Sequence, residues 1–152
     1  MMKEIKAPQR FQGVDRMRVW MLIVGFLASA AVAEAHVIVL PRESKTGAPE
    51  TYTMRVPTES RFATTSIELE VPEGVTITAI EAMEGARSET KKNGDRIVAM
   101  TWTTEIKPGD FRQFKFTATN PKDGAQITWK AHQHFADGTT SEWTPATTLT
   151  AP

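Results

Sequence analysis

Cysteine is absent from this chain of 152 residues. Its absence excludes disulfides, thiolate-based zinc or iron–sulfur sites, blue-copper centres and cysteine nucleophiles. Histidine is scarce, with three residues, and tyrosine occurs once. No charge of one sign is in excess, since 18 basic and 18 acidic residues give a formal net charge of zero. The composition therefore predicts no nucleic-acid partner, because proteins that bind nucleic acids carry an excess of basic residues on their binding surface.

Catalytic motifs are also absent. The sequence contains no G-x-S-x-G elbow, no phosphate-binding loop, no H-E-x-x-H pair and no G-x-G-x-x-G fingerprint. Carboxylates are frequent, but most fall at the polar positions of predicted strands, where a solvent-exposed sheet face places them. No glycosidase-like pair stands out among them. We therefore predict that the protein is not an enzyme.

The chain has a single long apolar run, residues 19–33, bounded by Arg18 and Glu34. It is shorter than the roughly 20 residues of a membrane-spanning helix. Basic residues precede it, and Ala33-Glu34-Ala35 follows with small side chains at the positions that signal peptidase requires. The pattern predicts a signal peptide over residues 1–35, cleaved between Ala35 and His36. A translation start at Met17 would shorten this leader, and a retained anchor is the alternative.

Cleavage would leave residues 36–152 as a mature domain that is mildly acidic, because the leader carries more basic than acidic residues. No second apolar run follows, so we expect the mature chain not to span a membrane. A protein with such a leader is periplasmic or secreted.

From residue 36 onward, apolar residues recur at every second position, as is typical of β-strands. Residues 66–71 alternate most clearly, with Ile67 and Leu69 on one face and Glu68 and Glu70 on the other. Turn signals separate the strands, and the strongest is the hairpin signal Asn93-Gly94. Strands are expected at residues 36–40, 52–56, 66–71, 75–80, 86–91, 96–103, 111–119, 127–135 and 140–143.

This spacing of strands predicts an all-β fold, an antiparallel β-sandwich of immunoglobulin- or fibronectin-like type over residues 36–145. A small barrel is the alternative. Trp102 and Trp129 alternate with core-facing positions and are expected in the core. Residues 146–152 are rich in Thr, Ala and Pro, so we expect a loose tail.

The residue that cleavage would place first is His36, which then offers two nitrogens, its α-amine and its ring Nδ1. Both can bind one metal ion and close a six-membered chelate ring. An α-amine has an ordinary pKa near 7.7–8.0, so it can lose its proton to a metal at neutral pH. Two nitrogens with oxygen donors suit Cu(II). The alternative is that histidine stands here by chance.

Several segments of the mature chain recur together in a known family. In this order and spacing they resemble the YcnI-like copper-binding family across about residues 36–145. The segments are His36-Val-Ile-Val-Leu-Pro41, Tyr52-Thr-Met-Arg-Val-Pro57 with Glu59, Thr64-Thr-Ser-Ile-Glu-Leu-Glu-Val-Pro72-Glu-Gly-Val75, Thr101-Trp102, Ile106-Lys-Pro-Gly109, Asn120-Pro121, Trp129-Lys-Ala131, Asp137-Gly138 and Glu142-Trp143-Thr144.

The resemblance implies a site for Cu(II) built on a single-histidine N-terminal brace. Its ligands would be the amine and ring of His36 and the carboxylate of Glu59, with Trp143 standing over the metal. Glu50 is the rival carboxylate. The resemblance carries no ligand onto His132 or His134, which fall on the polar face of their strand and are expected at the surface.

The expected function is that of an exported Cu(II)-binding protein, a copper chaperone or metallochaperone in copper homeostasis. Soft ligands for Cu(I) are limited to Met54, Met83 and Met100 in the mature chain. The resemblance implies a membrane copper transporter of the CopC/CopD type as partner. Two alternatives are a copper oxidative enzyme of the polysaccharide-monooxygenase type, with His132 or His134 as second histidine ligand, and a metal-free structural or adhesion sandwich.

Overall fold

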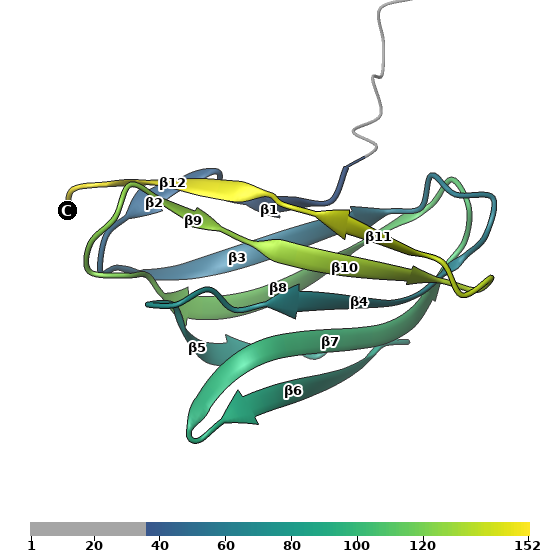
Figure 1. The fold of residues 1–152 in the computed structure, drawn as a ribbon, viewed down its shortest axis with the longest axis horizontal. Coiled ribbons are helices and arrows are strands. Elements are labelled where there is room, and N and C mark those ends of the chain that lie inside the picture. Colours follow the sequence, from purple (N-terminus) through teal and green to yellow (C-terminus); the bar gives the residue numbers. More distant parts are fainter. Residues whose placement is uncertain (1–35) are drawn as a thin grey trace, which may run out of the picture. The chain divides into compact units, whose positions relative to one another are not determined.

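The structure is a computed structural model that describes residues 36–152. The predicted signal peptide, residues 1–35, lies outside the described residues. Within residues 36–152 all regular structure is β-strand, and no helix there could cross a membrane. The strands are β1 (Ile38–Leu40), β2 (Glu43–Lys45), β3 (Pro49–Pro57), β4 (Thr64–Glu70), β5 (Thr76–Ile80), β6 (Arg87–Asn93), β7 (Arg96–Ile106), β8 (Phe111–Thr119), β9 (Gln126–Thr128), β10 (Lys130–Phe135), β11 (Thr140–Trp143) and β12 (Ala146–Thr150), as drawn in Figure 1.

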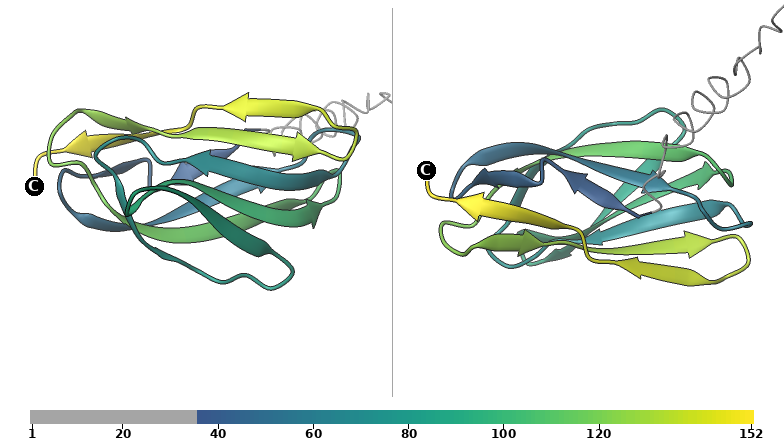
Figure 2. Two further views of the ribbon diagram at one scale, coloured as in Figure 1. Left: turned by 60° about the horizontal axis from the view of Figure 1, so that its bottom comes forward. Right: turned by 90° about the horizontal axis from the view of Figure 1, so that it is seen from above.

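Two large antiparallel sheets form a sandwich, and the predicted β-sandwich is confirmed. One sheet has the order β1-β3-β8-β5, and the other has the order β11-β10-β4-β7-β6. A small third sheet, β2-β12-β9, contains the parallel pair β2–β12. Figure 2 shows the strands from two further directions.

The core lies between the two large sheets and follows from the alternation in the sequence. Ile67 and Leu69 of β4 are buried, while Glu68 and Glu70 point to the other face, as predicted. Trp102 and Trp129 are buried, also as predicted. Aromatic rings fill the middle of the core. The contacts include Tyr52–Phe116 at 5.5 Å, Tyr52–Trp129 at 5.0 Å and Trp102–Phe114 at 5.2 Å between ring centroids.

The predicted hairpin is confirmed, but its two turn residues are Gly94 and Asp95, one position later than the predicted Asn93-Gly94. Asn93 of β6 pairs with Arg96 of β7, and Gly94 has a φ of 63°. A two-residue hairpin turn with positive φ is tolerated best by glycine, so the backbone conformation explains the residue found there.

The prediction of one strand over residues 127–135 is wrong. The chain forms β9 and β10, which belong to different sheets and are separated at Trp129. The backbone N–H of Trp129 donates to the carbonyl of Pro145 at 2.8 Å, and its indole Nε1 donates to Thr147 Oγ1 at 3.1 Å. These contacts with the following segment fix the point at which the chain changes sheet.

The expected loose tail is a strand instead. Residues 146–150 form β12, which pairs with β9 and with β2. Thr147 and Leu149 are buried, because every second side chain of β12 faces inward. Residues 43–45 lie between the expected strands 36–40 and 52–56; they form β2, the other partner of β12.

Two edge strands position the candidate site. β1 lies at the edge of the four-stranded sheet and β11 at the edge of the five-stranded sheet. Ile38 of β1 pairs with Arg55 of β3 in antiparallel register. The chain before β1 therefore runs alongside the Pro57 end of β3, where β3 stops.

Candidate metal centre

His36 lies two residues before β1 and is exposed to solvent. The residues that follow anchor it, because Val37 and Val39 are buried in the core. His36 thus begins a segment whose side chains alternate between core and surface. It borders an open pocket of about 550 Å³, lined by His36, Val37, Ile38, Val39, Arg42, Glu142, Trp143, Thr144, Pro145 and Ala146.

Trp143 stands against His36. The centroids of the two rings are 5.3 Å apart, and the ring planes meet at 79°, an edge-to-face contact. Trp143 is the last residue of β11 and pairs with the buried Ala131 of β10. Its side chain is half-buried and packs against the core. The structure therefore brings His36 and Trp143, two of the predicted site residues, into contact.

Gln133 fixes the indole of Trp143 from inside the core. The Trp143 Nε1–H donates to Gln133 Oε1 at 3.0 Å. The side-chain nitrogen of Gln133 donates to the carbonyl of Pro57 at 2.9 Å and to the Thr64 hydroxyl at 2.7 Å. Gln133 is almost fully buried, so these hydrogen bonds satisfy a polar group that would otherwise be costly to bury.

Glu59 borders a hollow that also includes Trp143. It follows Pro57, the last residue of β3, and is exposed. Glu59, Gln133 and Trp143 border a second hollow of about 330 Å³. Trp143 is the residue that this hollow shares with the His36 pocket, so both predicted ligands lie next to the same indole.

Glu50 lies at the opposite end of β3. The register that sets Ile38 against Arg55 places the chain before β1 near Pro57. Glu50 is seven positions before Pro57, which is roughly 20 Å along an extended strand. Its carboxylate accepts a hydrogen bond from the Ser44 hydroxyl at 2.8 Å. Glu50 therefore lies in a different part of the sandwich from His36.

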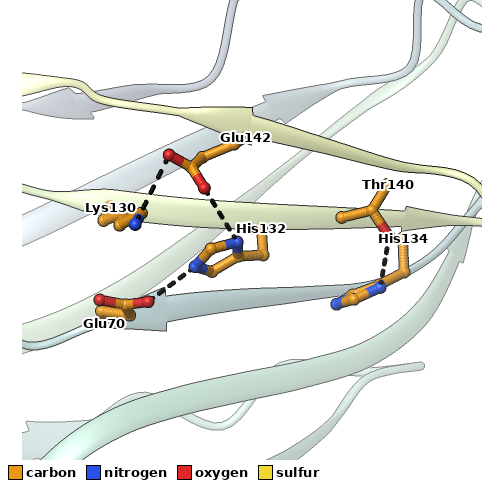
Figure 3. A network of polar contacts seen from close by, with 6 residues as sticks. All are labelled: Glu70, Lys130, His132, His134, Thr140 and Glu142. Atoms are coloured by element: carbon orange, nitrogen blue, oxygen red, sulfur yellow. Dashed lines mark hydrogen bonds and ion pairs between the residues drawn. The ribbon is translucent and has the colours of Figure 1, made fainter.

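His132 and His134 point away from this site, as the sequence predicts. Both lie on the outward face of β10, whereas Ala131 and Gln133 on the same strand face the core. His132 contacts Glu70, with Nε2 at 2.8 Å from a carboxylate oxygen, and His134 Nδ1 lies 3.1 Å from the Thr140 hydroxyl (Figure 3). Neither histidine borders the pocket of His36.

The sequence-based prediction misses two residues of this region. Gln133 continues an otherwise apolar alternation, and a polar residue at such a position signals a buried hydrogen-bonded group. Glu142 borders the His36 pocket, and its carboxylate also faces His132 and Lys130 on β10. Its place on an edge strand, opposite His132, follows only from the strand register.

The donor set around Trp143 suits a metal with nitrogen and oxygen preferences. The His36 imidazole is exposed and lies at the border of an open pocket, and the Glu59 carboxylate borders a neighbouring hollow that shares Trp143 with it. No thiolate is present in the chain, so the soft ligands that select Cu(I) are limited to methionine thioethers.

The family described as "Domain of unknown function (DUF1775)" matches residues 36–151. The chain belongs to this family. The resemblance to the YcnI-like family is thereby confirmed, and the matched range of the DUF1775 domain includes β12.

A named relative adds to this assignment. The chain is 41% identical over 126 residues to "Copper-binding protein CutI" of Bacillus subtilis (strain 168), covering 80% of this chain and 62% of that protein. The chain therefore spans about three fifths of the length of this relative.

Solved structures agree on the fold. An uncharacterized protein from Nocardia farcinica with an immunoglobulin-like fold superposes with a TM-score of 0.69 at 25% identity, covering 78% of this chain and 99% of that one. A cohesin module from a Clostridium perfringens glycoside hydrolase gives a TM-score of 0.53 at 13% identity, covering 78% and 99%. The DUF1775 domain is thus of immunoglobulin-like type.

Proposed function

We propose that this protein is an exported Cu(II)-binding protein, a copper chaperone of the periplasm or the cell exterior, and not an enzyme. The contact that carries the proposal is that of the exposed His36 ring with Trp143, 5.3 Å between centroids, at the border of an open pocket. Membership of the DUF1775 family and the 41% identity to a copper-binding protein support it.

In this proposal, removal of the leader turns the backbone nitrogen of His36 into an α-amine. The amine and the ring Nδ1 then bind Cu(II) as a single-histidine brace, and the Glu59 carboxylate supplies oxygen donors. A carboxylate adds one negative charge to two neutral nitrogens, which partly balances the charge of Cu(II). An indole is a poor ligand for Cu(II), so Trp143 acts by covering one face of the ion and limiting water access.

Transfer of the copper, not chemistry on a substrate, is the proposed role. An oxidative copper enzyme of the monooxygenase type needs a second histidine ligand, and His132 and His134 lie on the outward face of β10. An exposed, shallow site with few ligands suits release of its cargo. The proposed recipient is a membrane copper transporter of the CopC/CopD type.

The test compares two mature forms of the chain. One begins at His36, and the other carries a Gly-Ser-Gly-Ser extension that moves the α-amine out of chelating reach. We expect the first to bind one Cu(II) with two nitrogen donors visible in the EPR spectrum. We expect the extended form to lose at least about tenfold in affinity, the scale of effects seen for groups that support a metal site.

Two controls complete this test. Intact mass of the secreted protein establishes whether cleavage occurs between Ala35 and His36, and His36→Ala removes the imidazole while leaving the amine. Equal Cu(II) affinity of the extended and the unextended form would refute the brace. Peroxide-dependent turnover that disappears with His132→Ala or His134→Ala would favour the enzyme instead.

A further inference from the structure

A second group of metal-binding side chains lies on the outward face of the five-stranded sheet. His132 of β10 stands directly opposite Glu68 of β4 on one side and Glu142 of β11 on the other. Glu70 is two positions along β4 from Glu68 and therefore shares this face. The strands β4 and β10 have hydrogen-bonded neighbours on both sides, so the backbone beneath the cluster is held in place.

Figure 3 shows two carboxylates, those of Glu70 and Glu142, that reach the His132 imidazole. His132 Nε2 lies 2.8 Å from Glu70 Oε1, and Nδ1 lies 3.7 Å from Glu142 Oε2. One ligand atom each from Glu68, Glu70 and His132 lie within 4.8 Å of one another. In a tetrahedral zinc site with ligands at roughly 2.0–2.1 Å, ligand atoms are about 3.3 Å apart. The glutamates are only partly buried, so rotation of their side chains can close this difference.

The charges on this face favour a bound cation. Glu68, Glu70 and Glu142 bring three carboxylates around one imidazole. Lys130 is a cation of this face: it stands opposite Glu70 in the strand register, and its Nζ lies 3.6 Å from Glu142. On the other side of β4, the residues of β7 opposite Glu68 and Glu70 are the uncharged Thr101 and Ala99.

We propose that His132, Glu68 and Glu70 form a second metal site, separate from His36, that binds a divalent ion of the Zn(II) and Cu(II) class. An imidazole with two carboxylates is a donor set that zinc takes in proteins, with water in the fourth position. An imidazole nitrogen disfavours Mg²⁺ and Ca²⁺, which take oxygen ligands. On such a nitrogen–oxygen set Cu(II) binds more tightly than Zn(II).

The test uses the mature chain with His36→Ala, so that the brace proposed above cannot contribute. Calorimetric titration with Zn(II), and separately with Cu(II), should give one equivalent of each. Zn(II) should shift the imidazole nitrogen resonances of His132 in long-range ¹⁵N spectra and leave those of His134 in place. Because His36 is absent, failure of the brace and failure of this second site are separate results.

Matched variants identify the ligands. In the same background, His132→Gln and Glu70→Gln should each weaken Zn(II) binding at least tenfold. His134→Gln is the control, since His134 lies two positions away on the same face and contacts the Thr140 hydroxyl. Thermal unfolding without metal checks that each variant folds, and Glu68→Gln replaces any that does not. The proposal is overturned if the parent binds no Zn(II) at 100 micromolar, if His132→Gln binds as the parent does, or if His134→Gln loses as much.

Discussion

The indole nitrogen of Trp143 is held by a hydrogen bond of 3.0 Å to the side-chain oxygen of the buried Gln133. The same side chain donates to the carbonyl of Pro57, two residues before Glu59. One buried amide therefore connects the residue that covers His36 with the segment that presents the candidate carboxylate. The orientation of this surface site is set by a polar contact inside the core.

Replacing Gln133 by leucine should destabilise the domain by about 1–3 kcal/mol, because the hydroxyl of Thr64 and the carbonyl of Pro57 lose their buried donor. Urea unfolding measures the change as a shift of the midpoint. Gln126→Leu is the control, since Gln126 is exposed and contacts only Thr128 among the side chains. An exposed substitution of this kind should stay within about 0.5 kcal/mol. Equal midpoints for the two variants would contradict the role given to Gln133.

The contact between His36 and Trp143 predicts that Cu(II) quenches tryptophan emission. The mature chain should lose the emission of Trp143 on titration with Cu(II), because a paramagnetic ion held by the His36 ring lies against the indole. Trp143→Phe should remove most of the quenching, since Trp102 and Trp129 lie in the core. His36→Ala should remove it as well. Quenching of the same size in Trp143→Phe would place the ion elsewhere.

A pair of matched variants tests whether Glu59 or Glu50 is the carboxylate ligand. Glu59→Gln should weaken Cu(II) binding by about tenfold or more, because an anionic oxygen ligand is lost. Glu50→Gln should leave affinity within twofold, since Glu50 contacts Ser44 at the other end of β3. Competition with a chelator of known affinity measures both. The reverse order of effects would assign the ligand to Glu50.

Stability should fall at alkaline pH through Tyr52. Burial raises the pKa of the Tyr52 phenol above its ordinary value, with the negative charge of Glu50 adding to this effect and hydrogen bonds with Ser44 and Asn120 opposing it. A raised folded pKa means that the folded state holds the proton more tightly than the unfolded chain. This contribution to stability is complete below about pH 10 and is lost as pH rises through the folded pKa.

The measurement is direct because Tyr52 is the only tyrosine. Phenolate absorbance of the folded protein should titrate above the midpoint of the urea-unfolded protein. Tyr52→Phe should flatten the fall in stability at high pH. A folded midpoint at or below the unfolded one would contradict the effect assigned to burial.

Much of the fold could be predicted because side-chain alternation carries it. The faces of residues 66–70, the extent of β8 and the hairpin between β6 and β7 agree with the sequence. The break between β9 and β10 could not be predicted, since Ile127, Trp129 and Ala131 are all buried and alternation continues across it. The contacts of Trp129 with Pro145 and Thr147, which are made only in the folded domain, mark that break.

Other features of the structure could not be predicted for different physical reasons. The Thr-rich composition of residues 146–150 suggested a loose end, although the alternation of Thr147 and Leu149 was a usable signal. The neighbours of His132 depend on the register of β4, β10 and β11, and alternation within one strand does not determine register. The proximity of His36 and Trp143 is predicted only through the family resemblance, because no local sequence pattern connects residues so far apart in the chain.

The pocket beside His36 is lined by residues 36–39 and 42 together with 142–146, which come from the two ends of the domain. Ribosomes synthesise a chain from its amino end, so His36 emerges well before residues 142–146, which line the other part of its pocket. Until residues 142–146 have docked, His36 can meet a ligand only as an isolated side chain. The complete pocket therefore forms only after the last strands have joined the sandwich, so a ligand that needs the whole pocket binds only the finished domain.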